Sequence, residues 1–125
     1  MARLKEIVID ARHPAALARF WARAIDGYAV RSYDAAEIAR LAARGLTPET
    51  DPNVAVDGPG PTLFVQRARA PVPERSTLHL DLACDSRAAE AARLVSLGAR
   101  VRDVHASHTV MLDPEGNAFC LQGPP

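Results

Sequence analysis

The chain has 125 residues, and its 15 acidic side chains balance its 15 basic ones. This length predicts one globular domain, and the lack of a basic field argues against nucleic acid or an anionic membrane as a partner. No apolar run approaches the ~20 residues of a membrane span, and the start MARLKE has no signal-peptide apolar region. The two cysteines, Cys84 and Cys120, form no CxxC or zinc-ribbon spacing. We therefore expect a reduced, cytoplasmic protein.

The first half of the chain predicts a strand, a helix and two further strands. EIVID, residues 6–10, alternates apolar and polar side chains, as a half-buried strand does. A helix is expected to begin near Pro14, because proline is favoured in a first turn, and to end at Gly27, because glycine commonly ends a helix. YAVRSY and TLFVQRA, residues 28–33 and 62–68, are expected as strands.

An additional segment separates these last two strands. Residues 34–44 predict a helix, because Asp34 with Glu37 three positions later resembles a capping box and an apolar stripe follows at helical spacing. Residues 48–61 are rich in Pro, Gly and Asp, which predicts a loop with a short strand at 54–56. One hypothesis is that the inserted helix acts as a lid, with its apolar stripe over the mouth of a cavity.

The second half repeats this order of elements. HLDLACD, residues 79–85, alternates like the first strand. A helix is expected to begin at Ser86 or the aspartate before it and to stop at Gly98. ARVRDV and NAFCLQG predict later strands. DPEGN, residues 113–117, predicts a turn before the last strand, because proline suits its second position and Gly116 can take a positive φ.

Two such halves, with HLDL opening the second and DPEGNAFC closing it, resemble the vicinal oxygen chelate superfamily, and most closely its small glyoxalase-like branch. The HPAALARFW helix start and the LGA after the second helix fit the same pattern. The resemblance implies an α+β fold of two βαβββ modules that form a curved mixed sheet around a cavity, with an extra helix inserted in the first module. It implies a single domain over residues 1–125, with modules at about 1–70 and 75–123. It also implies a homodimer that binds a small organic ligand.

Strand alternation divides the side chains of each predicted sheet into two faces. One face is expected to pack under the helices, and its members are Ile7, Ile9, Leu63, Val65, Leu80, Leu82, Phe119 and Leu121. The opposite face is expected to line the cavity, and its members are Glu6, Val8, Asp10, Phe64, Gln66, His79, Asp81, Ala83, Ala118, Cys120 and Gln122. Cys84 has the opposite parity from His79, so we expect a core thiol there. His108, in VHASHTV, is expected at the cavity rim.

Three residues of the cavity face are the predicted catalytic set: His79, Glu6 and Asp81. His79 and Asp81 are two apart on one strand, so both project to the same side, and Glu6 should lie across the pseudo-symmetric centre. A histidine near carboxylates can act as general acid or base near neutral pH. Alternatively, the carboxylate only fixes the histidine ring in a polar ligand pocket. The predicted ligand-binding set is Val8, Asp10, Phe64, Gln66, Cys120, Gln122 and His108.

The resemblance also implies where a metal would bind. The ligand positions of metal-binding relatives correspond here to Glu6, His79 and Cys120, with Phe64 at a fourth position that cannot bind a metal. Only His79 has the usual residue type. Carboxylate, imidazole and thiolate are all zinc ligands, but one thiolate suits magnesium, manganese or iron poorly. We therefore expect no metal cofactor and interpret Cys120 as the mark of a lost metal site, with zinc as the alternative.

The fold alone does not select a function, because the superfamily includes metal-dependent lyases and isomerases, dioxygenases, antibiotic-modifying transferases and metal-free drug-binding proteins. We favour a metal-independent lyase- or isomerase-type enzyme that acts on a small molecule. The first alternative is a non-catalytic protein that binds a drug or metabolite, as resistance proteins do. The second is a zinc-dependent enzyme that uses Glu6, His79 and Cys120.

Overall fold

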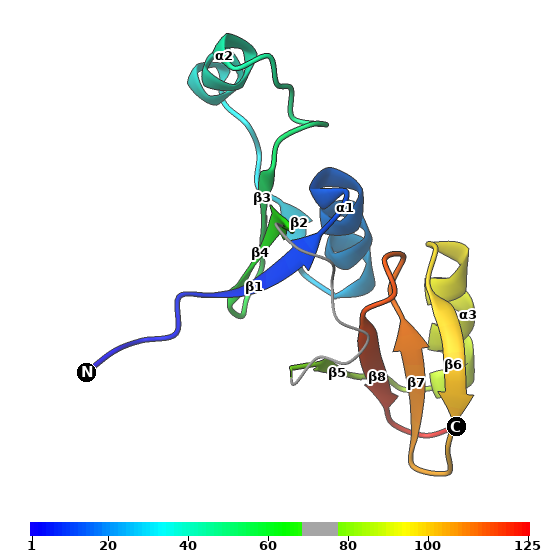
Figure 1. Cartoon of the computed structure of the whole chain (residues 1–125). Coiled ribbons are helices and arrows are strands. Elements are labelled where there is room, and N and C mark those ends of the chain that lie inside the picture. Colours follow the sequence, from blue (N-terminus) through cyan, green and yellow to red (C-terminus); the bar gives the residue numbers. More distant parts are fainter. Residues whose placement is uncertain (69–77) are drawn as a thin grey trace. The chain divides into compact units, whose positions relative to one another are not determined.

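The structure is a computed structural model that describes residues 1–68 and 78–125, which form two compact units (Figure 1). Each unit contains one four-stranded sheet of mixed direction and one helix that packs on it. Each is described by itself. The predicted α+β fold of two βαβββ modules is confirmed.

The sheet of the first unit has the strand order β1-β4-β3-β2. Its strands are β1 (Glu6–Ala11), β2 (Ala29–Val30), β3 (Asn53–Asp57) and β4 (Thr62–Arg67), and its helices are α1 (Pro14–Ala24) and α2 (Ala35–Ala43). β1 runs parallel to β4, whereas β3 is antiparallel to both β4 and β2. β2 is shorter than the predicted strand at 28–33, because the chain leaves the sheet there to enter the insertion.

The sheet of the second unit has the strand order β5-β8-β7-β6. Its strands are β5 (Leu80–Ala83), β6 (Arg100–Val104), β7 (His108–Leu112) and β8 (Ala118–Gln122), and its helix is α3 (Arg87–Ser96). β5 is parallel to β8, and the other neighbours are antiparallel. Each strand of this unit therefore has a counterpart in the first unit, which confirms the internal repeat.

One helix covers one face of each sheet. The buried residues of α1 include Leu17, Phe20 and Trp21, and the aromatic rings of the last two pack edge to face at 5.2 Å between centroids. The larger apolar sheet residues buried in the two units are Val54, Val56, Leu63, Val65, Met111, Phe119 and Leu121. None of the helices within the described ranges is long and apolar enough to cross a membrane.

The predicted alternation of faces therefore holds on the inner strands β4 and β8. On β1 and β5 the predicted core residues are half-buried; these are Ile7, Ile9, Leu80 and Leu82. β1 and β5 lie at the ends of the two strand orders, so each has only one hydrogen-bonded neighbour. Cys84 is also half-buried rather than fully buried, and both cysteines are free thiols.

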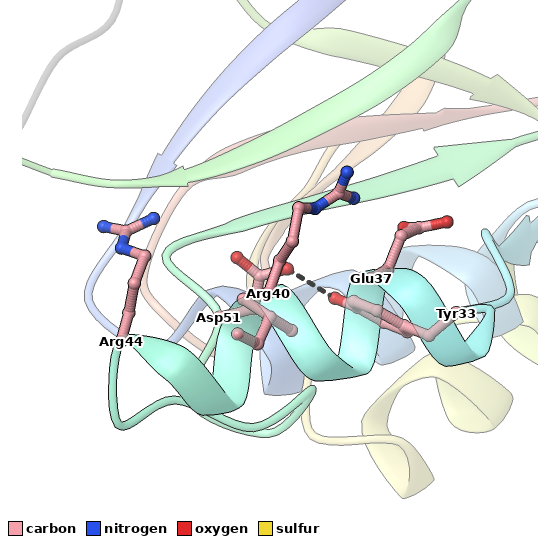
Figure 2. Close-up of a pocket in the computed structure, with 6 residues that line it drawn as sticks. Tyr33, Glu37, Arg40, Arg44 and Asp51 are labelled. Carbon is pink, nitrogen blue, oxygen red and sulfur yellow. Dashed lines mark hydrogen bonds between the residues drawn. The ribbon is translucent and has the colours of Figure 1, made fainter.

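The inserted helix α2 lies between β2 and β3. Its N-cap is Asp34, whose Oδ1 accepts a hydrogen bond of 2.8 Å from the Glu37 amide, as the sequence predicts. The Tyr33 hydroxyl donates to Asp51 Oδ2 at 2.8 Å and so joins the two ends of the insertion (Figure 2). No residue of α2 is buried, and in Figure 1 the helix stands away from the sheet of its own unit. The lid role stays a prediction.

A buried arginine organises the second unit. Arg87 is 4% exposed, and its guanidinium donates to the carbonyls of Gly123, His105 and Ala106 at 2.8–2.9 Å and to the Thr109 hydroxyl at 3.2 Å. These bonds connect the start of α3 to the β6–β7 turn, to β7 and to the chain that follows β8. Arg87 therefore holds α3, the β6–β7 turn and the chain after β8 in fixed positions around the second sheet.

The DPEGN turn before β8 is built on a second buried polar residue. Asp113 has no exposed surface, and its Oδ1 accepts hydrogen bonds of 2.9 Å from the amides of Glu115 and Asn117. Its Oδ2 accepts from the Asn117 side chain at 2.8 Å. Gly116 has a φ of 89°, the left-handed conformation that the sequence predicts there.

Candidate functional site

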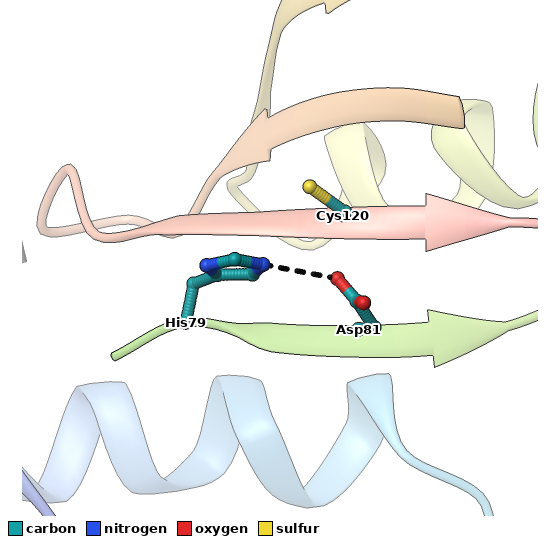
Figure 3. A group of neighbouring side chains, drawn as sticks. All are labelled: His79, Asp81 and Cys120. Carbon is teal, nitrogen blue, oxygen red and sulfur yellow. Dashed lines mark ion pairs between the residues drawn. The ribbon is translucent and has the colours of Figure 1, made fainter. Parts of the chain in front are cut away.

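The open face of the second sheet brings a histidine and an aspartate into contact. His79 directly precedes β5, and Asp81 follows two residues later, so their side chains lie on the same side. His79 Nε2 is 3.2 Å from Asp81 Oδ1 (Figure 3), and each side chain is 53% exposed. Asp81 holds the His79 ring through Nε2, and the ring is open to solvent, so its other nitrogen can exchange a proton with a bound molecule.

Cys120 lies beside this pair on the neighbouring strand. The parallel register pairs Cys120 of β8 with Asp81 of β5, and the ligand atoms of His79, Asp81 and Cys120 all lie within 4.8 Å of one another. Burial, together with the charge and hydrogen bonding of Asp81, raises the pKa of the Cys120 thiol above its ordinary value of 9.0. The thiol is therefore protonated at neutral pH, which makes Cys120 a poor nucleophile.

The same three residues have the right donor types for zinc: an imidazole nitrogen, a carboxylate oxygen and a thiol sulfur. Of the described residues, these three form the group able to hold a metal ion. A metal would have to displace the thiol proton and replace the contact between His79 and Asp81. The group differs from the predicted metal set because Asp81 takes part in it. Glu6 lies in the other unit, so the predicted set of Glu6, His79 and Cys120 stays a prediction.

Two other predicted residues, His108 and Gln122, share the face of Cys120. His108 of β7 is the register partner of Gln122 of β8, next to the pair formed by Val110 and Cys120. His108 is half-buried, and its Nδ1 lies 2.9 Å from the Ser107 hydroxyl. Its ring stacks on that of His105 at 4.6 Å between centroids. This face therefore combines polar groups from β5, β7 and β8.

In the first unit the predicted residues also share one open face. The register pairs Val8 with Phe64 and Asp10 with Gln66, and the Gln66 amide donates to Asp10 Oδ1 at 2.9 Å. Val8 and Asp10 are exposed, while Phe64 and Gln66 are half-buried. Glu6 is half-buried and pairs in register with Thr62 at the start of the same two strands.

Sequence analysis missed a polar cluster at one end of this face. The Arg31 guanidinium makes a bidentate contact with Asp57, at 2.7 Å and 2.9 Å, and the Thr62 hydroxyl donates to Asp57 at 2.7 Å. These hydrogen bonds lower the pKa of Asp57 and raise the pKa of Arg31. Val110, which faces Cys120 across the β7–β8 register, was also missed. The alternation in SHTV, residues 107–110, could have indicated Val110, because it lies two residues after His108 on the same strand face. Nothing local indicates the pairing of Arg31 with Asp57.

Comparisons with solved structures show the same fold at low identity. A hypothetical protein from S. aureus is 11% identical, with a TM-score of 0.68 over 98% of this chain and 95% of that one. The fosfomycin resistance protein FosX from Mesorhizobium loti is 14% identical, with a TM-score of 0.68 over 100% and 94% of the two chains. A glyoxalase/bleomycin resistance protein/dioxygenase family enzyme from Burkholderia phytofirmans PsJN is 15% identical, with a TM-score of 0.63 over 99% and 100%.

The comparison with curated proteins found no match. The comparison with protein families matches residues 6–122 to the glyoxalase-like domain, so the match extends from β1 to β8. It agrees with the glyoxalase/bleomycin resistance/dioxygenase relatives found by structure. This chain belongs to the glyoxalase-like domain family.

Proposed function

We propose that this chain is a metal-independent enzyme of the lyase or isomerase type, which binds a small organic molecule and moves a proton on it. The observation that carries the proposal is the 3.2 Å contact between His79 Nε2 and Asp81 Oδ1 on the open face of the second sheet. Both side chains are about half exposed, so a bound molecule can reach the ring without a change in the fold. Histidine is the side chain best suited to accept and return a proton near neutral pH.

The roles follow from the geometry of the pair. Asp81 accepts the hydrogen on Nε2 of the neutral ring, which leaves Nδ1 as the nitrogen that takes a proton from the bound molecule. The carboxylate then stabilises the imidazolium that forms, and Nδ1 returns the proton to another atom of the same molecule or to a leaving group. Glu6 is proposed to orient the substrate. The proposed binding residues are Val8, Asp10, Phe64, Gln66, Cys120, Gln122 and His108.

Proton transfer can be tested before the substrate is known. Small oxo and hydroxy acids that raise the melting temperature of the protein would be selected first, since a native-state ligand stabilises by mass action. Their C–H exchange with D₂O would then be followed by proton NMR. We expect His79→Gln to slow enzyme-dependent exchange about 10²–10⁴-fold, Asp81→Asn to slow it less, and the control His13→Gln, an exposed histidine of the first unit, to leave it unchanged.

Two outcomes would contradict the proposal. Exchange that persists at the original rate in His79→Gln would remove the proposed proton carrier. Tight binding without exchange, for every ligand found, would favour the alternative of a non-catalytic drug- or metabolite-binding protein.

A zinc enzyme is the second candidate, and the proximity of His79, Asp81 and Cys120 favours it. Bound zinc would supply a Lewis acid and an acidic water. Elemental analysis of protein purified without added metal tests it, with His79→Ala, Cys120→Ala and the free-thiol control Cys84→Ala. Stoichiometric zinc that is lost in the first two variants and kept in the control would support this candidate over the metal-independent one. Retention in Glu6→Ala would show that Asp81 rather than Glu6 completes the set.

We further propose that residues 1–125 work as one domain and pair as a homodimer in the cytoplasm. The dimer rests on resemblance alone, so light scattering on the purified protein is the direct test. A mass of twice the chain's 13.4 kDa would support it, and a mass of 13.4 kDa would remove it.

A further inference from the structure

A small pocket lies on the inserted segment of the first unit, and none of its lining residues belongs to the proposed catalytic set. Its volume is about 200 Å³, and its lining comes from α2 and the two ends of the insertion: Tyr33, Glu37, Arg40, Leu41, Arg44 and Asp51. This volume lies below the roughly 300–1,000 Å³ of pockets for drug-sized ligands. The pocket therefore suits a compact molecule.

The pocket has a fixed wall. The Tyr33 hydroxyl donates to Asp51 Oδ2 at 2.8 Å, and the Asn53 amide donates to Asp51 Oδ1 at 2.9 Å, so both carboxylate oxygens are engaged. Burial and the bond to Asp51 raise the pKa of Tyr33, so the phenol is neutral at physiological pH. The Tyr33 side chain therefore remains a hydrogen-bonded wall rather than a charged group.

Two arginines line the pocket beside this wall. Arg40 lies in the last turn of α2 and Arg44 is the C-cap, four residues later, so two positive charges come together at this end of the helix. Within residues 1–68 and 78–125 neither guanidinium has a hydrogen-bond or ion-pair partner. Other arginines of the same unit do pair, Arg19 with Glu49 and Arg31 with Asp57. Two adjacent unpaired guanidiniums beside a pocket are suited to an anion, because each offers several donors.

Glu37 sets a limit on what the pocket can accept. It lines the pocket one turn before Leu41, toward the opposite end from Arg44 (Figure 2). Its carboxylate would repel a ligand that carries negative charge along its whole length. A ligand with one oxyanion group at the arginine end keeps that group away from Glu37. The Asp51 carboxylate, whose two oxygens already accept hydrogen bonds, is then the repulsion that the two guanidiniums must offset.

We propose that Arg40 and Arg44 form a second ligand site, which binds the carboxylate or phosphate group of a compact metabolite against the wall of Tyr33 and Asp51. Arg40 lies on a helix with no buried residue and Arg44 is its exposed C-cap, so both arginines can be replaced without disturbing the core. It is separate from the acid–base pair on the second sheet, and its occupancy does not depend on proton transfer there.

Amide NMR titrations of the full chain with inorganic phosphate and, separately, with acetate test the site at constant low ionic strength, because salt screens such contacts. We expect saturable shifts for residues 33–51 with at least one anion, and the better one identifies the oxyanion chemistry. The variant Arg40→Gln/Arg44→Gln should bind about tenfold or more weakly, as expected for the loss of charge-assisted hydrogen bonds. Arg3→Gln/Arg100→Gln removes the same charge elsewhere and should bind as the original chain does.

Glu37→Gln gives a change of opposite sign. Removal of this carboxylate should tighten anion binding. If binding depended only on the net charge of the protein, both arginine double variants would weaken it equally. The inference is wrong if no residue in 33–51 shows a saturable shift with either anion. It is also wrong if the Arg3/Arg100 control weakens binding as much as the Arg40/Arg44 variant, or if Glu37→Gln weakens it. Unchanged amide shifts away from the substituted residues and their neighbours verify that each variant is folded.

Discussion

Replacement of Arg87 by methionine should destabilise the second unit by about 3 kcal/mol, a value that follows from the surroundings of its guanidinium. Its four hydrogen bonds would be lost, while the methionine keeps most of the buried stem. The Thr109 acceptor is 3% exposed and would stay dry. Gly123, His105 and Ala106 are exposed residues, so water can partly replace the arginine at their carbonyls.

These terms set the magnitude. Hydrogen bonds from a charged donor contribute roughly 1.5–3 kcal/mol each, but release of the guanidinium from a buried position offsets several kcal/mol of their sum. Partial rehydration of three acceptors lowers the loss further. For an m-value of about 2 kcal/mol/M in urea, a loss of about 3 kcal/mol moves the unfolding midpoint down by about 1.5 M.

Urea unfolding followed by far-UV circular dichroism measures the change. Trp21, the one tryptophan of the chain, lies in α1 of the first unit, so its fluorescence reports that unit separately. The matched control is Arg93→Met on the same helix, where an exposed pair with Glu90 contributes under about 0.5 kcal/mol. The reasoning is refuted if Arg87→Met unfolds within about 0.5 kcal/mol of Arg93→Met. A shift in circular dichroism without a shift in fluorescence would show that the units unfold separately.

Three further predictions concern other polar groups. Asp113→Ala should lower the free energy of unfolding by about 2–3 kcal/mol, because it leaves the amides of Glu115 and Asn117 without their acceptor. Asp103→Ala, at an exposed aspartate of the same unit, is the denaturation control. Asp57 has a lowered pKa in the folded state, so the stability from its pairing with Arg31 is present above pH 3.8 and is lost as the pH falls through the folded-state pKa. Asp57→Asn should therefore reduce the loss of unfolding free energy at acidic pH. The change should be small, since both side chains are largely exposed. Asp81→Asn should lower the pKa of the Cys120 thiol and speed its alkylation below pH 9, which mass spectrometry measures. Cys84 is the internal control, because its pKa is raised by burial and by Glu90 rather than by Asp81. Equal alkylation rates of Cys120 in the two proteins would contradict the contact with Asp81.

Much of the fold could be predicted from sequence because the signals were local. Asp34 and Ser86 cap α2 and α3 as expected, and the DPEGN segment forms the predicted turn. β2 was predicted too long, because strand propensity in YAVRSY does not reveal where the chain leaves the sheet. The half-burial of core positions on β1 and β5 depends on strand order, which is a tertiary property.

The sequence predicts the part of the candidate site that depends only on which side chains of one strand share a face. Residues two apart on a strand share a face, so the contact between His79 and Asp81 followed from their spacing. The approach of Cys120 to Asp81 needs the register of β5 with β8, and the pairing of Arg31 with Asp57 needs that of β2 with β3. Such pairings join residues 26 or more positions apart, and no local pattern specifies them.

The repeat lets equivalent positions of the two sheets be compared directly. Leu80 with Phe119 corresponds to Ile7 with Leu63, so the next pair, Asp81 with Cys120, corresponds to Val8 with Phe64. The same open position is thus polar in one module and apolar in the other. Within the proposed function, in which residues of both modules bind the substrate, we propose that the second sheet supplies the proton-transfer groups and that Val8 and Phe64 supply apolar contact area.

This division of work predicts opposite kinetic effects of two substitutions. Phe64→Ala removes apolar contact that is equal in the ground and transition states, so it should raise KM with little change in kcat. Asp81→Asn removes the charge that stabilises a protonated His79, so it should lower kcat with little change in KM. Steady-state kinetics on a substrate found by the exchange screen would measure both, with Val95→Ala on the exposed side of α3 as the control. If Phe64→Ala lowers kcat as strongly as Asp81→Asn does, the apolar face takes part in the chemistry and the proposed division is wrong.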